Sequence, residues 1–351
     1  MFSDRTNMAN AKLVHRLTSD FDRQSDNSTN TENIINNINK KHKQSSSSLG
    51  QDETDGMSSV RQSYESRNFS AKTTSIIMAS WRSGTKRQYS IYIRKWTCYC
   101  CKRKINYIQS TLNENLDFLT SLYENSLSYS AINSARSALS AFGIVHDGVN
   151  FGSHPVVIRF MKGIYNLRPP MPRYIHTWDV SIVLKELRHV SPVKYLTLKN
   201  LTYKLAMLIC LIIAGRTQSL HLLSMQNMIR GTYSYILQYS GLLKQSGSGR
   251  NNPIVELKAY PPDRRLCCIT VLTEYLKRTE SLRKNHCSLF ISYVKPYNPV
   301  SKSTISRWLK TFMCKSGIDI NKYYVHSIRA ASASKAKLLC IPIDNILKSA
   351  G

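Results

Sequence analysis

The sequence predicts a mainly α-helical protein with two domains, and three observations lead to this prediction. Apolar residues recur at helical spacing from about residue 72 to residue 166. A proline-rich segment then interrupts the pattern, and helical spacing resumes beyond it together with one stretch of strand-forming residues. A chain of 351 residues with 42% hydrophobic residues is long enough to form two cores.

Residues 1–70 are rich in Ser, Asn, Asp and Thr and have little apolar periodicity. Such a segment buries too little surface to offset the entropy lost on ordering, so we expect a disordered polar tail. Lys40, Lys41 and Lys43 within it are a candidate nuclear targeting signal, although three lysines in a polar tail are more often only solvated charge. We expect the protein to be nuclear.

Residues 71–167 are predicted to form a compact domain of four helices. In the first helix Tyr89, Ile93, Trp96 and Cys100 follow one another at spacings of four, three and four, which places them on one face. Three further apolar stripes follow, and the last begins after Pro155, a residue favoured at helix starts. These stripes are Leu112, Leu116, Leu119 and Leu122; Ile132, Ala135, Leu139 and Phe142; and Val157, Phe160, Met161 and Ile164.

Residues 168–177 are predicted to form an extended linker, because Pro169, Pro170 and Pro172 exclude a continuous helix. A second domain is expected over residues 178–351. It begins with a helix containing Val180, Val183, Leu184 and Leu187 behind Thr177 and continues with a buried helix from Leu205 to Ala214 that leads to Arg216.

A small antiparallel sheet is predicted next. Residues 233–239 and 254–257 are rich in strand formers, and Ser240-Gly241 and Gly247-Ser248-Gly249 are turn sequences. Lys244 is therefore expected on this sheet, near a turn. Helical patterns return over residues 266–277, 304–315 behind Ser303, and 326–339.

The charge of the chain favours a polyanionic partner. The formal net charge is +28 and the isoelectric point is about 9.8. The longest apolar stretch is too short to span a bilayer and the N-terminus lacks a secretory pattern, so we expect an intracellular protein that binds nucleic acid and no membrane. Cys98, Cys100 and Cys101 lack a second Cys or His pair at zinc spacing, and no glycine-rich phosphate loop is present. Neither a metal nor a cofactor is predicted.

Four residues of the second domain suggest a phosphate site. They are Arg216 in Ala-Gly-Arg-Thr-Gln-Ser-Leu, Lys244 in Leu-Leu-Lys-Gln-Ser, and His326 with Arg329 in His-Ser-Ile-Arg. Each is weak evidence alone, because an arginine after a buried helix is usually a surface cation. In this order after a basic helical domain, they resemble the catalytic domain of the tyrosine recombinases, the phage integrase family. The matching segments look closest to recombinases of DIRS-type retrotransposons.

The resemblance covers residues 72–351 and implies a helical, SAM-like core-binding domain at 71–167 followed by a catalytic domain at 178–351, closed around double-stranded DNA. It implies that Arg216 and Arg329 bind phosphate oxygens, that Lys244 protonates the leaving 5′ oxygen, with Lys258 as a weaker candidate, and that His326 assists proton movement. It also implies a tetramer on DNA. Outside the first apolar stripe, Lys86, Arg87, Arg94 and Lys95 are the predicted DNA-binding residues.

Two departures from the family pattern bear on activity. Ser219 stands where many members carry an acidic residue that orients the first arginine, and no tyrosine follows Tyr324, although the family nucleophile comes after the His-x-x-Arg motif. We therefore expect a chain truncated before the nucleophile and inactive by itself. Tyr323 and Tyr324 match no nucleophile position.

Three other functions remain open on the sequence. One is a catalytically inactive DNA-binding relic, in which the arginines only hold phosphates, and another is a type IB topoisomerase, which uses similar Arg and Lys chemistry. RNA binding is the weakest alternative, because the sequence has no RNP-like aromatic motif.

Overall fold

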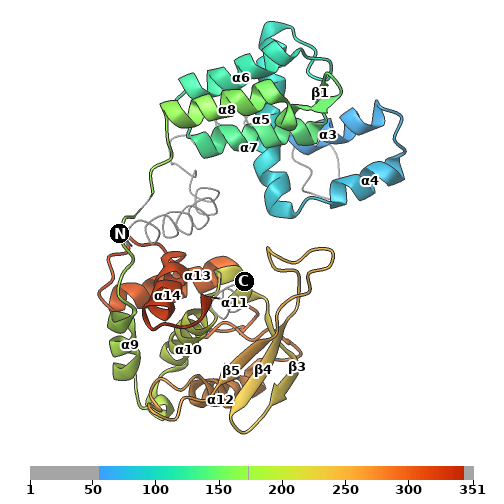
Figure 1. Ribbon diagram of the computed structural model, residues 1–351. Helices are drawn as coiled ribbons and strands as arrows, with labels where there is room; N and C mark the ends of the chain where they lie inside the picture. The colour runs from blue at the N-terminus through green and yellow to red at the C-terminus, as the bar shows by residue number, and fades with distance from the viewer. Residues whose placement is uncertain (1–54, 173, 344–351) are drawn as a thin grey trace. The chain divides into compact units, whose positions relative to one another are not determined.

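The computed structural model describes residues 55–172 and 174–343. They belong to two compact units divided between Arg173 and Tyr174, inside the predicted linker at 168–177 (Figure 1). The candidate targeting lysines Lys40, Lys41 and Lys43, and most of the predicted polar tail, lie outside the described residues. Each unit is considered separately below.

Unit 1 is helical, with one two-stranded hairpin (Figure 1). The four predicted helices are present as α5 to α8. In chain order the elements are α3 (Asp55–Glu65), α4 (Ala71–Ala79), α5 (Ser83–Arg103), α6 (Leu112–Glu124), α7 (Tyr129–Phe142), β1 (Val145–His146), β2 (Val149–Asn150), the short 3-10 helix η2 (Phe151–Ser153) and α8 (Pro155–Leu167).

The core of unit 1 is assembled from the predicted stripes. Ile93, Trp96 and Cys100 on α5 are buried, as the spacing requires. The Trp96 ring packs edge-on against Phe118 of α6 with 5.2 Å between the ring centroids, and its indole nitrogen donates to the Tyr107 carbonyl at 3.1 Å. The large aromatic ring is thus buried without leaving its polar group unsatisfied.

The expected polar tail does not hold for residues 55–65, which form α3. Met57 and Val60 are buried in the core of unit 1, and the buried Ser63 hydroxyl donates to the Phe142 carbonyl at 2.9 Å. Met57, Val60 and Tyr64 follow one another at helical spacing, a short signal that the polar composition around it masks. Helix α4 was not among the four predicted helices, and the Ser70 side chain caps its start by accepting a hydrogen bond from the Thr73 amide at 3.2 Å.

Unit 2 is mainly helical, as predicted, and its small sheet lies to one side of the helices (Figure 1). The antiparallel sheet has the order β3-β4-β5. Its first strand was not predicted, because the β3–β4 register shifts between Ser224 and Ile229 and disturbs the alternation. The elements are α9 (Val180–His189), η3 (Val193–Tyr195), α10 (Leu198–Ile212), α11 (Thr217–His221), β3 (Leu223–Arg230), β4 (Ser234–Tyr239), β5 (Val255–Lys258), α12 (Cys268–Thr279), η4 (Glu280–Leu282), α13 (Lys302–Lys315) and α14 (Ser327–Leu338).

Helix α10 is the central element of unit 2. Every residue from Leu201 to Cys210 is buried, and α11, α12, α13 and α14 all contact the helix. A helix that is apolar on all sides requires this surrounding shell. Across the described ranges, no helix combines the length and apolar character needed to cross a membrane.

Lys204 is the one charged residue in the buried stretch of α10. Its side chain is fully buried, and Nζ donates to the Leu187 carbonyl at 2.8 Å, the Val190 carbonyl at 2.6 Å and the Ser191 hydroxyl at 2.9 Å. Burial lowers the pKa of this ammonium to about 8, so it keeps its proton at neutral pH. It therefore satisfies carbonyls at the C-terminal end of α9 that no later turn of that helix can reach.

We predict that Lys204→Met destabilises unit 2 by about 2–3 kcal/mol, because buried oxygen acceptors lose their donor while the side-chain volume is kept. The free energy of unfolding in urea measures the change. Lys199→Met is the matched control, since Lys199 lies exposed on the same helix. A Lys204→Met protein as stable as the wild type would contradict the assigned role.

Candidate functional site

The end of α10 directs Arg216 out of the core. Ala214 adopts a left-handed backbone with φ of 43°, and the Gly215 amide donates to the Cys210 carbonyl at 3.2 Å, which ends α10 in a Schellman motif. A Cβ on Gly215 would lie 2.6 Å from Cδ1 of Ile213. The chain therefore turns sharply, and Arg216 becomes the N-cap of α11 with a half-buried side chain.

Helix α11 is tied to the start of α13. Nδ1 of His221 lies 3.0 Å from the Val300 carbonyl, so that nitrogen carries the proton and donates it. The Ser301 hydroxyl accepts from the Thr304 amide and caps α13, whose first residue is Lys302. These bonds fix Lys302 relative to the helix that Arg216 opens.

His326 and Arg329 lie at the start of α14. Ser327 and Ile328, between them, are fully buried, and the Ser327 hydroxyl accepts from Nε1 of Trp178 at 2.8 Å. His326 is the N-cap residue, yet its side chain makes no capping hydrogen bond. The imidazole therefore does not act as a helix cap, and Arg329 follows one helical turn later.

Lys244 lies in the connection between β4 and β5 and not on a strand, which corrects the expected position. The connection runs beyond the sheet in Figure 1. It is braced from inside: Leu243 is buried, its amide donates to the Ser246 hydroxyl at 3.0 Å, and the Asn252 side chain donates to the Gly241 carbonyl at 2.8 Å. These side-chain bonds replace ladder pairing, so strand propensity could not reveal them. Lys244 itself is exposed.

The electrostatics of His326 link three of the four predicted residues. Burial lowers the pKa of the imidazole below its ordinary value of 6.5, and the positive charges of Lys302, Arg216 and Lys244 lower it further. His326 is therefore neutral at pH 7, in a positive field that an anion would relieve. Lys258 is ion-paired with Glu256 at 3.5 Å, and its charge is not among those acting on His326.

Lys302 is the residue that sequence reasoning missed. It is exposed, and of the three positive charges it has the largest effect on the pKa of His326. Its position depends on the contact between α11 and α13, which no local pattern encodes. Ser219, in the place of an acidic residue of the family, is half-buried in α11.

The predicted DNA-binding residues of unit 1 all lie on α5. Arg87, Arg94 and Lys95 are exposed and Lys86 is half-buried, on the flanks of the buried face. The thiols of the same helix diverge: Cys100 is buried, which raises its pKa to about 12, whereas Cys98 and Cys101 are exposed. Among the described residues, no three His, Cys, Asp or Glu side chains form a group suited to a metal ion.

Solved structures similar to this chain are tyrosine recombinases and integrases. The XerH site-specific recombinase bound to palindromic difH substrate, in a post-cleavage complex, is 13% identical with a TM-score of 0.55, over 96% of this chain and 87% of that chain. The pre-cleavage complex of XerH with difH substrate is 14% identical with a TM-score of 0.52, over 96% of this chain and 88% of that chain. The Tn1549 transposon integrase in complex with transposon right end DNA is 12% identical with a TM-score of 0.50, over 83% of this chain and 90% of that chain.

These similarities establish the fold: the chain has the mainly helical architecture of the tyrosine recombinases, as the sequence predicted. No family model matches the sequence, and no curated protein matches it. The fold is therefore shown by structure, while activity has to be argued from the residues.

We predict that Lys302→Gln raises the pKa of His326 toward 6.5, because it removes the positive charge that lowers this pKa most. Titration of the His326 ring protons by NMR measures this change. Since the unfolded chain binds this proton more readily, the contribution of His326 to stability is complete at neutral pH and is lost as the pH falls below 6.5. Lys310→Gln, exposed on the same helix, is the control. An unchanged His326 titration in Lys302→Gln would contradict the arrangement.

Proposed function

We propose that this chain is a DNA-binding tyrosine recombinase of mobile-element origin, closest to those of DIRS-type retrotransposons, that acts in the nucleus. In this proposal Arg216, Lys244, His326 and Arg329 surround one DNA phosphodiester. The observation that carries the proposal is the field at His326, a neutral imidazole on which Arg216, Lys244 and Lys302 act from three separate elements. Such a concentration of positive charge destabilises the free protein and is relieved by a phosphate.

The residue types suit phosphoryl transfer. The guanidinium groups of Arg216 and Arg329 can bind non-bridging phosphate oxygens in bidentate fashion and stabilise the charge of the transition state. Lys302 and His326 stand at the N-terminal ends of α13 and α14, where helix dipoles favour an anion. Neutral His326 is able to donate a hydrogen bond to the same phosphate.

In the proposed reaction, which belongs to the complete form of the recombinase, a tyrosine hydroxyl attacks the phosphorus, gives up its proton with the assistance of neutral His326, and forms a 3′-phosphotyrosyl bond. The bond between phosphorus and the 5′ oxygen breaks, and Lys244 gives its proton to that leaving oxygen. The exposed position of Lys244 on the β4–β5 connection allows the ammonium to approach a bound duplex. The attacking tyrosine is not Tyr324, which precedes His326.

Two further observations support DNA as the partner. The chain carries a net charge of +28, which favours binding to a polyanion. The XerH and Tn1549 proteins of the same fold were solved with their DNA substrates. We further propose that several copies assemble on DNA, as the family resemblance implies.

We predict that Arg329→Ala lowers any covalent strand cleavage by about 10²–10³-fold, because one donor to the transition state is lost. A nicked duplex that traps the covalent intermediate, followed by denaturing electrophoresis, measures adduct formation. Tyr324→Phe is the matched control and is expected to leave any adduct formation at the wild-type level, whereas an adduct present in the wild type and lost in a folded Tyr324→Phe protein would contradict the assignment. DNA binding without adduct would identify an inactive DNA-binding protein, and relaxation of any supercoiled plasmid a type IB topoisomerase.

We predict that replacing Lys86, Arg87, Arg94 and Lys95 of α5 with glutamine reduces the salt dependence of DNA affinity. The slope of log K against log salt is negative, and each lost phosphate contact reduces its magnitude by about 0.9. Fluorescence anisotropy with a labelled duplex at several salt concentrations gives the slope. For a comparison at equal net charge, Arg94→Gln with Lys95→Gln on α5 is set against Arg159→Gln with Lys162→Gln, both exposed on α8, so that each variant loses two positive charges. Equal slopes in the α5 variant and the control would remove α5 from the DNA-binding surface.

A further inference from the structure

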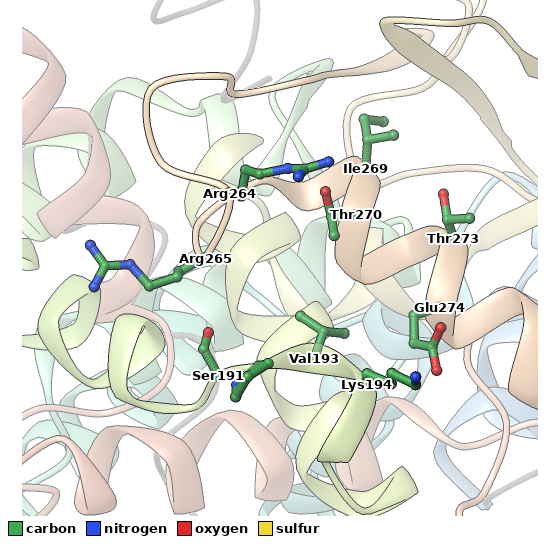
Figure 2. Close-up of a pocket in the computed structure, with 10 residues that line it drawn as sticks. Ser191, Val193, Lys194, Arg264, Arg265, Ile269, Thr270, Thr273 and Glu274 are labelled. Atoms are coloured by element: carbon green, nitrogen blue, oxygen red, sulfur yellow. The ribbon is translucent and has the colours of Figure 1, made fainter.

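A pocket of about 560 Å³ opens in unit 2 between η3 and the first turns of α12. Figure 2 shows Val193 on one side of it and Ile269, Thr270 and Thr273 on the other. Its walls are mainly apolar, formed by Pro192, Val193, Ile269 and the threonine methyl groups. None of the four proposed catalytic residues lines it, so it belongs to a different part of unit 2.

The rim of the pocket is cationic. Lys194, Arg264 and Arg265 lie around it, with Glu274 the one acidic residue of the lining. The Glu274 carboxylate is bound by Nε of Arg278 at 2.6 Å. Arg265 is likewise engaged by Asp263 at 2.9 Å, and hydrogen bonds from Arg265 and Arg188 hold the pKa of that carboxyl well below its ordinary value. The carboxylates near the pocket are therefore already paired.

Arg264 and Lys194 are the cations left to meet a ligand. Within the described residues, no hydrogen bond or ion pair involves the Arg264 guanidinium, and Lys194 only lies 6.0 Å from the centre of the Tyr195 ring. In Figure 2, Arg264 extends over Thr270 toward Ile269, while Lys194 lies across the pocket beside Glu274. Positive charge thus stands on two opposite sides of an apolar depression.

The η3 wall of the pocket is held from behind by two cations. Buried Lys204 binds the Val190 carbonyl and the Ser191 hydroxyl. Arg278 of α12 donates to the carbonyls of Leu196, Lys194 and Val193, the last at 3.2 Å. A wall fixed by so many hydrogen bonds loses little conformational entropy when a ligand binds, which favours affinity.

We propose that this pocket binds an acidic peptide segment of a partner protein. An apolar side chain of the segment enters between Val193 and Ile269, and carboxylates on either side of it meet Arg264 and Lys194. The apolar walls favour a peptide over DNA, because a duplex backbone presents phosphates but no side chain to fill a hydrophobic depression. The two separated cations fit a chain that crosses the pocket.

The test is fluorescence anisotropy of the full chain with a fluorescein-labelled Glu-Glu-Leu-Glu-Glu peptide. We expect saturable binding that falls roughly tenfold in Arg264→Glu and in Lys194→Glu, since one charge-assisted contact becomes a repulsion. Replacing the central leucine of the peptide by glycine should weaken binding by a similar factor. Lys310→Glu is the matched control, because Lys310 is exposed on α13, which contributes no residue to the pocket, and it should change binding less than about twofold.

Four outcomes would overturn the proposal. The first is the absence of saturable binding, and the second is equal affinity for the glycine peptide, which would show attraction by charge alone. The third is unchanged affinity in Arg264→Glu. The fourth is a loss of DNA affinity in Arg264→Glu as large as its loss of peptide affinity, with no such loss in Lys310→Glu, which would assign the rim to the DNA surface. Thermal unfolding of each variant shows that the exposed substitutions leave the fold intact.

Discussion

The burial of α10 on all sides is the constraint on which unit 2 depends. Because no face of this helix meets water between Leu201 and Cys210, the other helices of the unit must surround it. Its C-terminal end cannot continue into solvent as a helix, and the turn at Ala214 and Gly215 sets the position of Arg216. Toward its other end, Lys204 fixes the segment that forms one wall of the apolar pocket.

The candidate phosphate site opposes the stability of the fold that carries it. Arg216, Lys244 and Lys302 repel one another, and burial together with their combined field lowers the pKa of His326 and keeps the imidazole neutral. The surrounding structure tolerates this because each cation is anchored through a different element. Arg216 follows the end of α10, Lys244 lies in a loop braced by Asn252, and Lys302 opens a helix tied to α11 through His221. An anion would convert this repulsion into binding energy.

Apolar periodicity in the sequence predicts most of the helices, whereas elements and site residues that depend on contacts between distant parts of the chain leave no local pattern. The stripe containing Ile93 and Trp96 gave α5 because its burial repeats every three or four residues. Helix α3 was not predicted because Met57 and Val60 form too short a stripe within polar sequence, and their burial depends on the packing of α3 against α5 and α7. Lys302 and the Arg264 rim are surface cations in a chain with many, so only the fold distinguishes them.

Charge alone cannot assign a role to a residue when the net charge is +28. The two proposed sites differ in the residues that surround their cations. At the candidate phosphate site the cations lie near the half-buried imidazole of His326 and near helix N-terminal ends. These groups suit a small, highly charged anion such as a phosphodiester. Around the pocket of Arg264 the neighbours are Val193 and Ile269. These apolar side chains do not stabilise a phosphate, but an apolar side chain flanked by carboxylates can bury surface against them. The same excess of lysine and arginine thus serves two ligand classes, because the apolar residues around it differ.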